Sequence, residues 1–139
     1  MGCVQTFTNP GLECFSPDPA VCAVGSDYYL VTSTFAYFPG VPIYHSKDLV
    51  NWQQIGNVLD RASQLPLDGA KHSQGIFAPC IRHHQGIFYV ITTNVTHGGN
   101  FYVKSTNPAG PWSEPIVLPD ALGIDPSLFF DEDERCYYV

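Results

Sequence analysis

The sequence predicts an all-β protein that forms part of a β-propeller. Short segments rich in β-branched and aromatic residues alternate with turn signals, and no stretch shows convincing helical periodicity. The pattern also repeats: Pro19 and Trp52 correspond to Pro79 and Trp112, each 60 residues later. A repeat of this length with four strands per unit is typical of propellers, whose blades are four-stranded sheets.

The first unit, blade one, is expected at about residues 18–60. Its turn signals are a Gly-Ser-Asp hairpin and an aromatic loop interrupted by prolines and a glycine. Between them the sequence predicts four strands, at residues 20–24, 28–34, 43–46 and 53–59.

The second unit, blade two, is expected at about residues 76–119, with its first hairpin turn at His83-His84-Gln85-Gly86. Half of a third blade follows at about 124–139, where an acidic turn separates two strands. Propellers have four to eight blades, so we expect the chain to be an incomplete N-terminal part, about two and a half blades, of a propeller catalytic domain. The predicted strands are 78–82, 87–93, 100–105, 114–118, 127–130 and 136–139.

Composition narrows the class of partner. The 139 residues are 45% apolar and 14% charged, as in a single globular domain. The net charge is −7 and the six basic residues are scattered, which argues against nucleic acid and anionic membrane surfaces. No apolar run approaches a membrane span, and the first residues lack the features of a secretory signal, which slightly favours the cytoplasm.

Five cysteines, an odd number without CxxC spacing, argue against a zinc site or a compact disulfide framework. Neither a metal nor an organic cofactor is expected.

Two Asp-Pro corners contain the candidate catalytic residues. Asp18 lies between two prolines at the start of the first unit, and Asp125 precedes Pro126 at the start of the third. Inner strands of a propeller begin at one mouth of its channel, so the repeat brings these carboxylates to one place, as glycoside hydrolysis requires. Asp-Pro is also a common turn dipeptide, which is the alternative interpretation of either corner alone.

Phe35 and Phe77 lie near the two corners and are candidates for a platform under a sugar ring. Aromatic residues also form strands and cores, and for Phe35 the two interpretations are equally supported.

The chain resembles glycoside hydrolase family 43 in order and over nearly its whole length, most closely the β-xylosidase branch. The resemblance rests on the motifs Ser16–Val21, Asp27–Tyr29, Thr32–Phe35, Phe38–Val41, His45–Trp52, Gly75–Pro79, Gly110–Ser113 and Ile124–Phe129.

The resemblance implies a five-bladed propeller and an inverting glycosidase. It places Asp18 as the general base, and Asp125 as the carboxylate that tunes the pKa of the acid and orients the substrate. Phe35 matches an aromatic residue of the sugar subsite, and Phe77 stands where the family usually has Trp. Cys80 replaces a usual Asp.

The family's general acid is a glutamate expected beyond residue 139, so the isolated chain is expected to be inactive. None of its own glutamates stands in a matching motif: Glu13, Glu114, Glu132 and Glu134.

The function expected from the resemblance is release of xylose from β-1,4-xylo-oligosaccharides with inversion. An α-L-arabinofuranosidase of the same family is the nearest alternative, and a non-catalytic sugar-binding propeller fragment is the alternative of another class. Either way the expected partner is a xylo-oligosaccharide or an arabinoside. The oligomeric state is left open.

Overall fold

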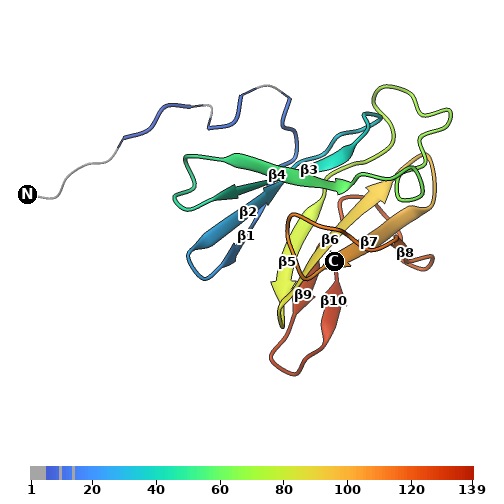
Figure 1. Ribbon diagram of the computed structural model, residues 1–139. Helices are drawn as coiled ribbons and strands as arrows, with labels where there is room; N and C mark the ends of the chain where they lie inside the picture. Colours follow the sequence, from blue (N-terminus) through green and yellow to red (C-terminus); the bar gives the residue numbers. More distant parts are fainter. Residues whose placement is uncertain (1–5, 10, 14) are drawn as a thin grey trace, which may run out of the picture.

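The computed structural model describes residues 6–9, 11–13 and 15–139, and within these residues it contains ten strands and no helix (Figure 1). The prediction of an all-β protein is therefore confirmed. The strands form three antiparallel sheets, in the orders β1-β2-β3-β4, β5-β6-β7-β8 and β10-β9. Their bounds are β1 Ala20–Val24, β2 Asp27–Val31, β3 Gly40–Ser46, β4 Gln53–Leu59, β5 Cys80–His84, β6 Ile87–Asn94, β7 Gly99–Ser105, β8 Ile116–Val117, β9 Leu128–Phe130 and β10 Cys136–Tyr138.

The first sheet differs from its prediction at both ends of the aromatic loop. Strand β2 ends at Val31, and Ser33 leaves the sheet to donate its backbone N–H to Pro17 O at 3.0 Å. Strand β3 begins earlier than predicted and includes Pro42. The proline is tolerated because β3 pairs there only with β4, opposite Asn57, and pairing with β2 starts at the next residue.

The second sheet corrects the position of its first turn. His83 and His84 lie in β5, and only Gln85 and Gly86 form the turn, both with positive φ. Two residues with positive φ match the twist of a tight hairpin. Both histidine rings pack against aromatic rings. The ring centroids of His83 and Phe88 are 4.7 Å apart, and the ring of His84 stacks on that of Phe130 in β9.

The three sheets stack face to face, as propeller blades do. Strand β1 packs against β5, and β5 against β9, so these three are the inner strands. Figure 1 shows the hairpin turns after β1, β5 and β9 at the same side of the molecule. The larger core cluster lies between the first two sheets: Val31, Val41, Ile43, Val58, Leu59, Leu65, Ile76, Ile81, Phe88, Val90, Phe101, Val103 and Trp112. A smaller cluster of Cys80, Ile91 and Leu128 joins the second sheet to the third.

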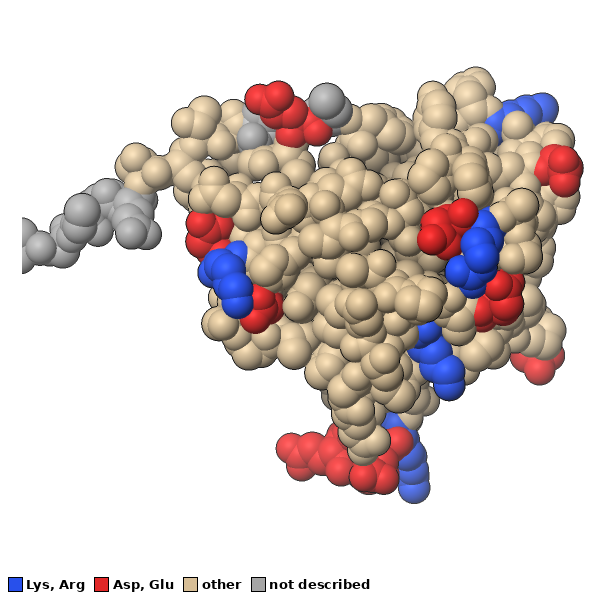
Figure 2. Space-filling view, in the orientation of Figure 1, with Lys and Arg blue, Asp and Glu red and all other residues tan. Residues whose placement is uncertain are grey.

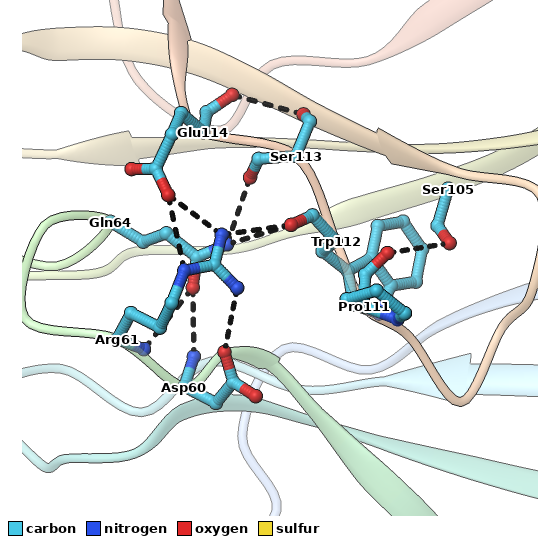
Figure 3. A network of polar contacts seen from close by, with 8 residues as sticks. All are labelled: Asp60, Arg61, Gln64, Ser105, Pro111, Trp112, Ser113 and Glu114. Atoms are coloured by element: carbon cyan, nitrogen blue, oxygen red, sulfur yellow. Dashed lines mark hydrogen bonds and ion pairs between the residues drawn. The ribbon is translucent and has the colours of Figure 1, made fainter.

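A polar network ties the connection between the first two sheets to the outer part of the second sheet (Figure 3). Gln64 is 1% exposed, and its Oε1 accepts hydrogen bonds from the backbone N–H groups of Asp60 and Arg61. Its Nε2 donates to Ser113 O at 2.8 Å. Arg61 Nη2 lies 2.8 Å from Glu114 Oε1. Because the buried Gln64 side chain bonds to backbone groups on both sides, it holds the two sheets together here.

The surface in Figure 2 carries acidic and basic side chains around its edge and is uncharged over its centre. No helix that is both long and apolar enough to cross a membrane occurs within the described residues. Cys22, Cys80 and Cys136 are free thiols, and the remaining two cysteines lie outside the described part of the chain.

Candidate active site

The two aspartates share an unusual backbone conformation. Asp18 has φ 52° and Asp125 has φ 58°, and both side chains are exposed. The left-handed region is uncommon for residues other than glycine, and aspartate is among those that tolerate it best. Each aspartate is followed by a proline and then by an inner strand, β1 or β9. The two repeat positions therefore share the same left-handed Asp-Pro conformation before an inner strand.

Backbone and side-chain hydrogen bonds fix both corners. The first is tied to the end of β2 through the bond from Ser33 to Pro17 O. The second is held by Asn100, whose Nδ2 donates to Ala121 O at 2.9 Å and Gly123 O at 3.1 Å. Asn100 is 2% exposed, so the anchor is buried although Asp125 is not.

Stacking of the inner strands decides where these corners lie. Since β1, β5 and β9 follow one another and their hairpin turns lie at the same side, their starting ends lie together at the other side (Figure 1). Asp18, Ala78 and Asp125 occupy those starting ends. The structure thus places the two aspartates at one end of the sheet stack, on the two neighbours of β5.

The two aromatic candidates meet beside this end. Phe35 has φ 48° and pairs with Ile76: its N–H donates to Ile76 O at 2.9 Å, and Ile76 N–H donates back at 3.0 Å. The rings of Phe35 and Phe77 lie edge to face, with centroids 5.8 Å apart. Both are half-buried and neither belongs to a core cluster, so they are available to line a surface site.

Gly75 permits the close approach of these segments, and it was not singled out from the sequence. It has φ 87°, and a Cβ at this position would lie 2.4 Å from Phe35 O. A glycine in strand-like sequence is a general signal of close backbone approach, but the partner, Phe35, lies 40 residues away in the chain.

Cys80 occupies a buried place beside the third sheet. Its Sγ lies 3.5 Å from Ser127 Oγ, which also accepts a hydrogen bond from Arg82 Nη2 at 3.1 Å. Arg82 Nε donates to Leu128 O at 3.0 Å. The guanidinium thus has oxygen partners here without a carboxylate at residue 80.

The glutamates whose contacts are described serve other purposes. Hydrogen bonds from Arg61, and then from Ser63, hold the pKa of Glu114 below its ordinary value, the opposite of what a general acid needs. Glu132 and Glu134 lie in the β9–β10 turn, at the far end of β9 from Asp125. No group of three His, Cys, Asp or Glu side chains that could hold a metal ion occurs among the described residues.

A model of the glycosyl hydrolases family 43 matches residues 7–139. The chain is 64% identical over 133 residues to a xylosidase/arabinosidase of Butyrivibrio fibrisolvens, covering 94% of this chain and 26% of the relative. It is 50% identical over 139 residues to the non-reducing end alpha-L-arabinofuranosidase BoGH43B of Bacteroides ovatus, covering 97% of this chain and 26% of that protein.

Among solved structures, the xylan beta-1,4-xylosidase from Bacillus halodurans C-125 superposes with a TM-score of 0.90 at 47% identity, covering 96% of this chain and 27% of that chain. The chain therefore spans about a quarter of the length of the proteins it matches. The solved family members are five-bladed β-propellers, so the two four-stranded sheets are propeller blades and the two-stranded sheet is part of a third, as predicted.

Proposed function

Because this chain belongs to the glycosyl hydrolases of family 43, we propose that it supplies the water-activating side of the active site of an inverting glycosidase that acts on pentose sugars. The observation that carries the proposal is the pair of left-handed Asp-Pro corners at the starting ends of inner strands β1 and β9. Both repeat units have an aspartate in this uncommon backbone conformation, and in both the carboxylate is exposed. Residues held in such conformations cluster at functional sites.

In the proposed reaction Asp18 is the general base. Its carboxylate takes a proton from a water molecule while the water oxygen bonds to the anomeric carbon. The bond from that carbon to the leaving oxygen breaks on the opposite face, which inverts the configuration. The leaving oxygen takes a proton from a separate carboxylic acid, which the family resemblance places C-terminal to residue 139.

Asp125 is proposed to raise the pKa of that acid and to orient the sugar. A negative charge nearby disfavours ionisation of a second carboxyl group, which keeps the acid protonated near neutral pH. Phe35 and Phe77 are proposed to contact the apolar face of the terminal sugar ring. Neither residue belongs to a core cluster, so both rings are available for this contact.

The proposed substrate is a β-1,4-xylo-oligosaccharide that is cut at its terminal xylose. An α-L-arabinofuranoside is the second candidate substrate. The Bacteroides ovatus relative is named as an arabinofuranosidase, and the Butyrivibrio fibrisolvens relative is named as both a xylosidase and an arabinosidase. Both sugars are pentoses, and the residues described here do not favour one ring form over the other.

A chimera tests the proposal. In the chimera, residues 7–139 replace the matching segment of the Butyrivibrio fibrisolvens xylosidase/arabinosidase. The unmodified Butyrivibrio fibrisolvens enzyme is the positive control for activity. We expect the chimera to hydrolyse nitrophenyl β-xyloside and xylobiose, with the α-anomer of xylose as the first product in proton NMR. First release of the β-anomer would contradict inversion. A higher kcat/KM on nitrophenyl α-arabinofuranoside would favour the second candidate.

Two variants of the chimera test the roles. Asp18→Asn should lower kcat by about 10³-fold or more, because an amide cannot accept the water proton. Asp125→Asn removes the charge that holds the acid protonated, so the alkaline limb of the kcat/KM pH profile should move to lower pH. Retained turnover in Asp18→Asn, with a melting temperature like that of the chimera, would remove Asp18 as the base. A folded chimera without turnover would favour the sugar-binding alternative.

A further inference from the structure

The aromatic contact at the mouth continues beyond the two residues assigned to the terminal sugar. From Phe77 to Phe35, Phe15 and Tyr37, consecutive ring centroids are 5.8, 6.1 and 6.0 Å apart. We call these four residues the aromatic row. Phe15 and Tyr37 are its outer members, because they are 59% and 62% exposed, whereas the inner two are half-buried.

Packing among the described residues does not account for the outer members. Neither Phe15 nor Tyr37 belongs to a core cluster, and each leaves more than half of its surface in water. Large apolar side chains that are both exposed and contiguous usually mark an interaction surface. Their rings pack edge to face at 72°, which leaves ring faces turned in different directions rather than stacked together.

The outer member Phe15 lies close to the proposed catalytic base along the chain. Phe15 precedes Asp18 by three residues, so their Cα atoms are within about 11 Å of each other. The loop after β2 returns to this segment: Ser33 N–H donates to Pro17 O, and Tyr37 N–H donates to Thr34 O at 2.9 Å. The two segments that carry Phe15 and Tyr37 are therefore tied together next to Asp18.

The chemistry of the row suits a neutral sugar. The loop from Thr34 to Pro42 has no charged residue, and neither does the segment from Phe15 to Pro17. The nearest charges along the chain are those of Glu13 and Asp18, which would repel an acidic sugar. An aromatic ring can cover the C–H face of a sugar while the Tyr37 hydroxyl group bonds to its hydroxyl groups.

We propose that Phe15 and Tyr37 form an additional sugar-binding position for the xylose residues that follow the terminal one in a neutral xylo-oligosaccharide. This inference rests on the proposed function, since it extends the same site. It assigns to these residues a preference for longer substrates, whereas Phe35 and Phe77 contact the terminal ring.

Binding to the inactive Asp18→Asn chimera is the test, with xylose and xylotriose as probes in calorimetry. We expect xylotriose to bind more tightly than xylose. The added substitutions Phe15→Ala and Tyr37→Ala should together lower the ratio of the two affinities about tenfold. Tyr37→Phe, which retains the ring, should preserve most of the ratio. Phe7→Ala is the matched control, because Phe7 is 63% exposed and lies outside the row.

The kinetic test uses the active chimera. The double variant should lower kcat/KM for xylotriose about tenfold, and Phe7→Ala should leave it unchanged. The proposal is overturned if the double variant keeps the affinity ratio, or if the Asp18→Asn chimera binds xylotriose no better than xylose. A chimera that binds xylotriose with the expected ratio but never hydrolyses it refutes the proposed activity and leaves the binding position standing.

Discussion

Replacing Gly75 by alanine should both destabilise the protein and displace Phe35. The new Cβ would lie 2.4 Å from Phe35 O, a contact that real side chains essentially never make. Gly75 is buried, and the atom it would strike is backbone, so no flexible side chain can move aside. Relief requires the chain at Phe35 to move away from the segment at Gly75 and Ile76 that precedes β5.

The magnitude follows from three contributions. An alanine with φ 87° costs about 1–2 kcal/mol in backbone strain. Overpacking in a rigid site costs about 1–3 kcal/mol. If Phe35 shifts, its two hydrogen bonds with Ile76 weaken, at about 1 kcal/mol each. The three contributions sum to about 4–7 kcal/mol, and we expect a loss of this size in the free energy of unfolding.

Gly69→Ala is the matched control. Gly69 also has a positive φ, 73°, but a Cβ there meets nothing within 4 Å, so only the strain of about 1–2 kcal/mol applies. The assay is urea unfolding of the chimera followed by tryptophan fluorescence, together with kcat/KM on nitrophenyl β-xyloside. Gly75→Ala should unfold at lower urea than Gly69→Ala and should also lose activity. Equal midpoints and equal activities would refute the argument that close approach, rather than backbone conformation alone, requires glycine.

Three further predictions concern other parts of the chimera. Gln64→Leu should cost about 1–3 kcal/mol of stability in the same assay, because three partly buried backbone groups lose their hydrogen-bond partner, and an unchanged midpoint would contradict this. Asn100→Ala should raise KM and lower kcat by loosening the loop that presents the second aspartate, and kinetics like those of the unchanged chimera would exclude that positioning role. Hydrogen bonds from Lys47, and then from His45, hold the pKa of Asp27 below its ordinary value. The stability from this carboxylate is therefore complete above about pH 4–5 and lost as the pH falls further, and Asp27→Asn should remove that part of the acid sensitivity in melts between pH 3 and 7.

Most of the strand positions could be predicted from the sequence, because strand and turn preferences are local. The segments 20–24 and 53–59 were predicted with the bounds that the structure has. The errors lie where contacts between sheets override local preference. Ser33 has neighbours typical of a strand, yet it bonds to Pro17 O and Ile76 O instead of extending β2. His83 and His84 have the polarity of a turn but pack against aromatic rings.

The candidate site divides in the same way. Asp18 and Asp125 could be selected from the sequence because proline restricts the backbone around each of them. That both adopt positive φ, and that Asn100 and Gly75 support the site, could not be predicted, since these features depend on residues far away in the chain.

The two tryptophans of the repeat show which features follow from the sequence and which depend on the tertiary structure. The 60-residue spacing of Trp52 and Trp112, with that of Pro19 and Pro79 and the strand pattern between them, predicted repeated four-stranded units, because a repeat is a property of the chain alone. Their environments differ: Trp112 is 3% exposed in the core between two sheets, whereas Trp52 is only half-buried and donates its ring N–H to Leu49 O at 3.2 Å. The burial of each tryptophan depends on which sheet packs against it, and this packing is defined only in the tertiary structure. For the same reason the sequence by itself determined the units, their acidic corners and the expectation that these corners meet, and only the tertiary structure showed that the aromatic row lies beside them.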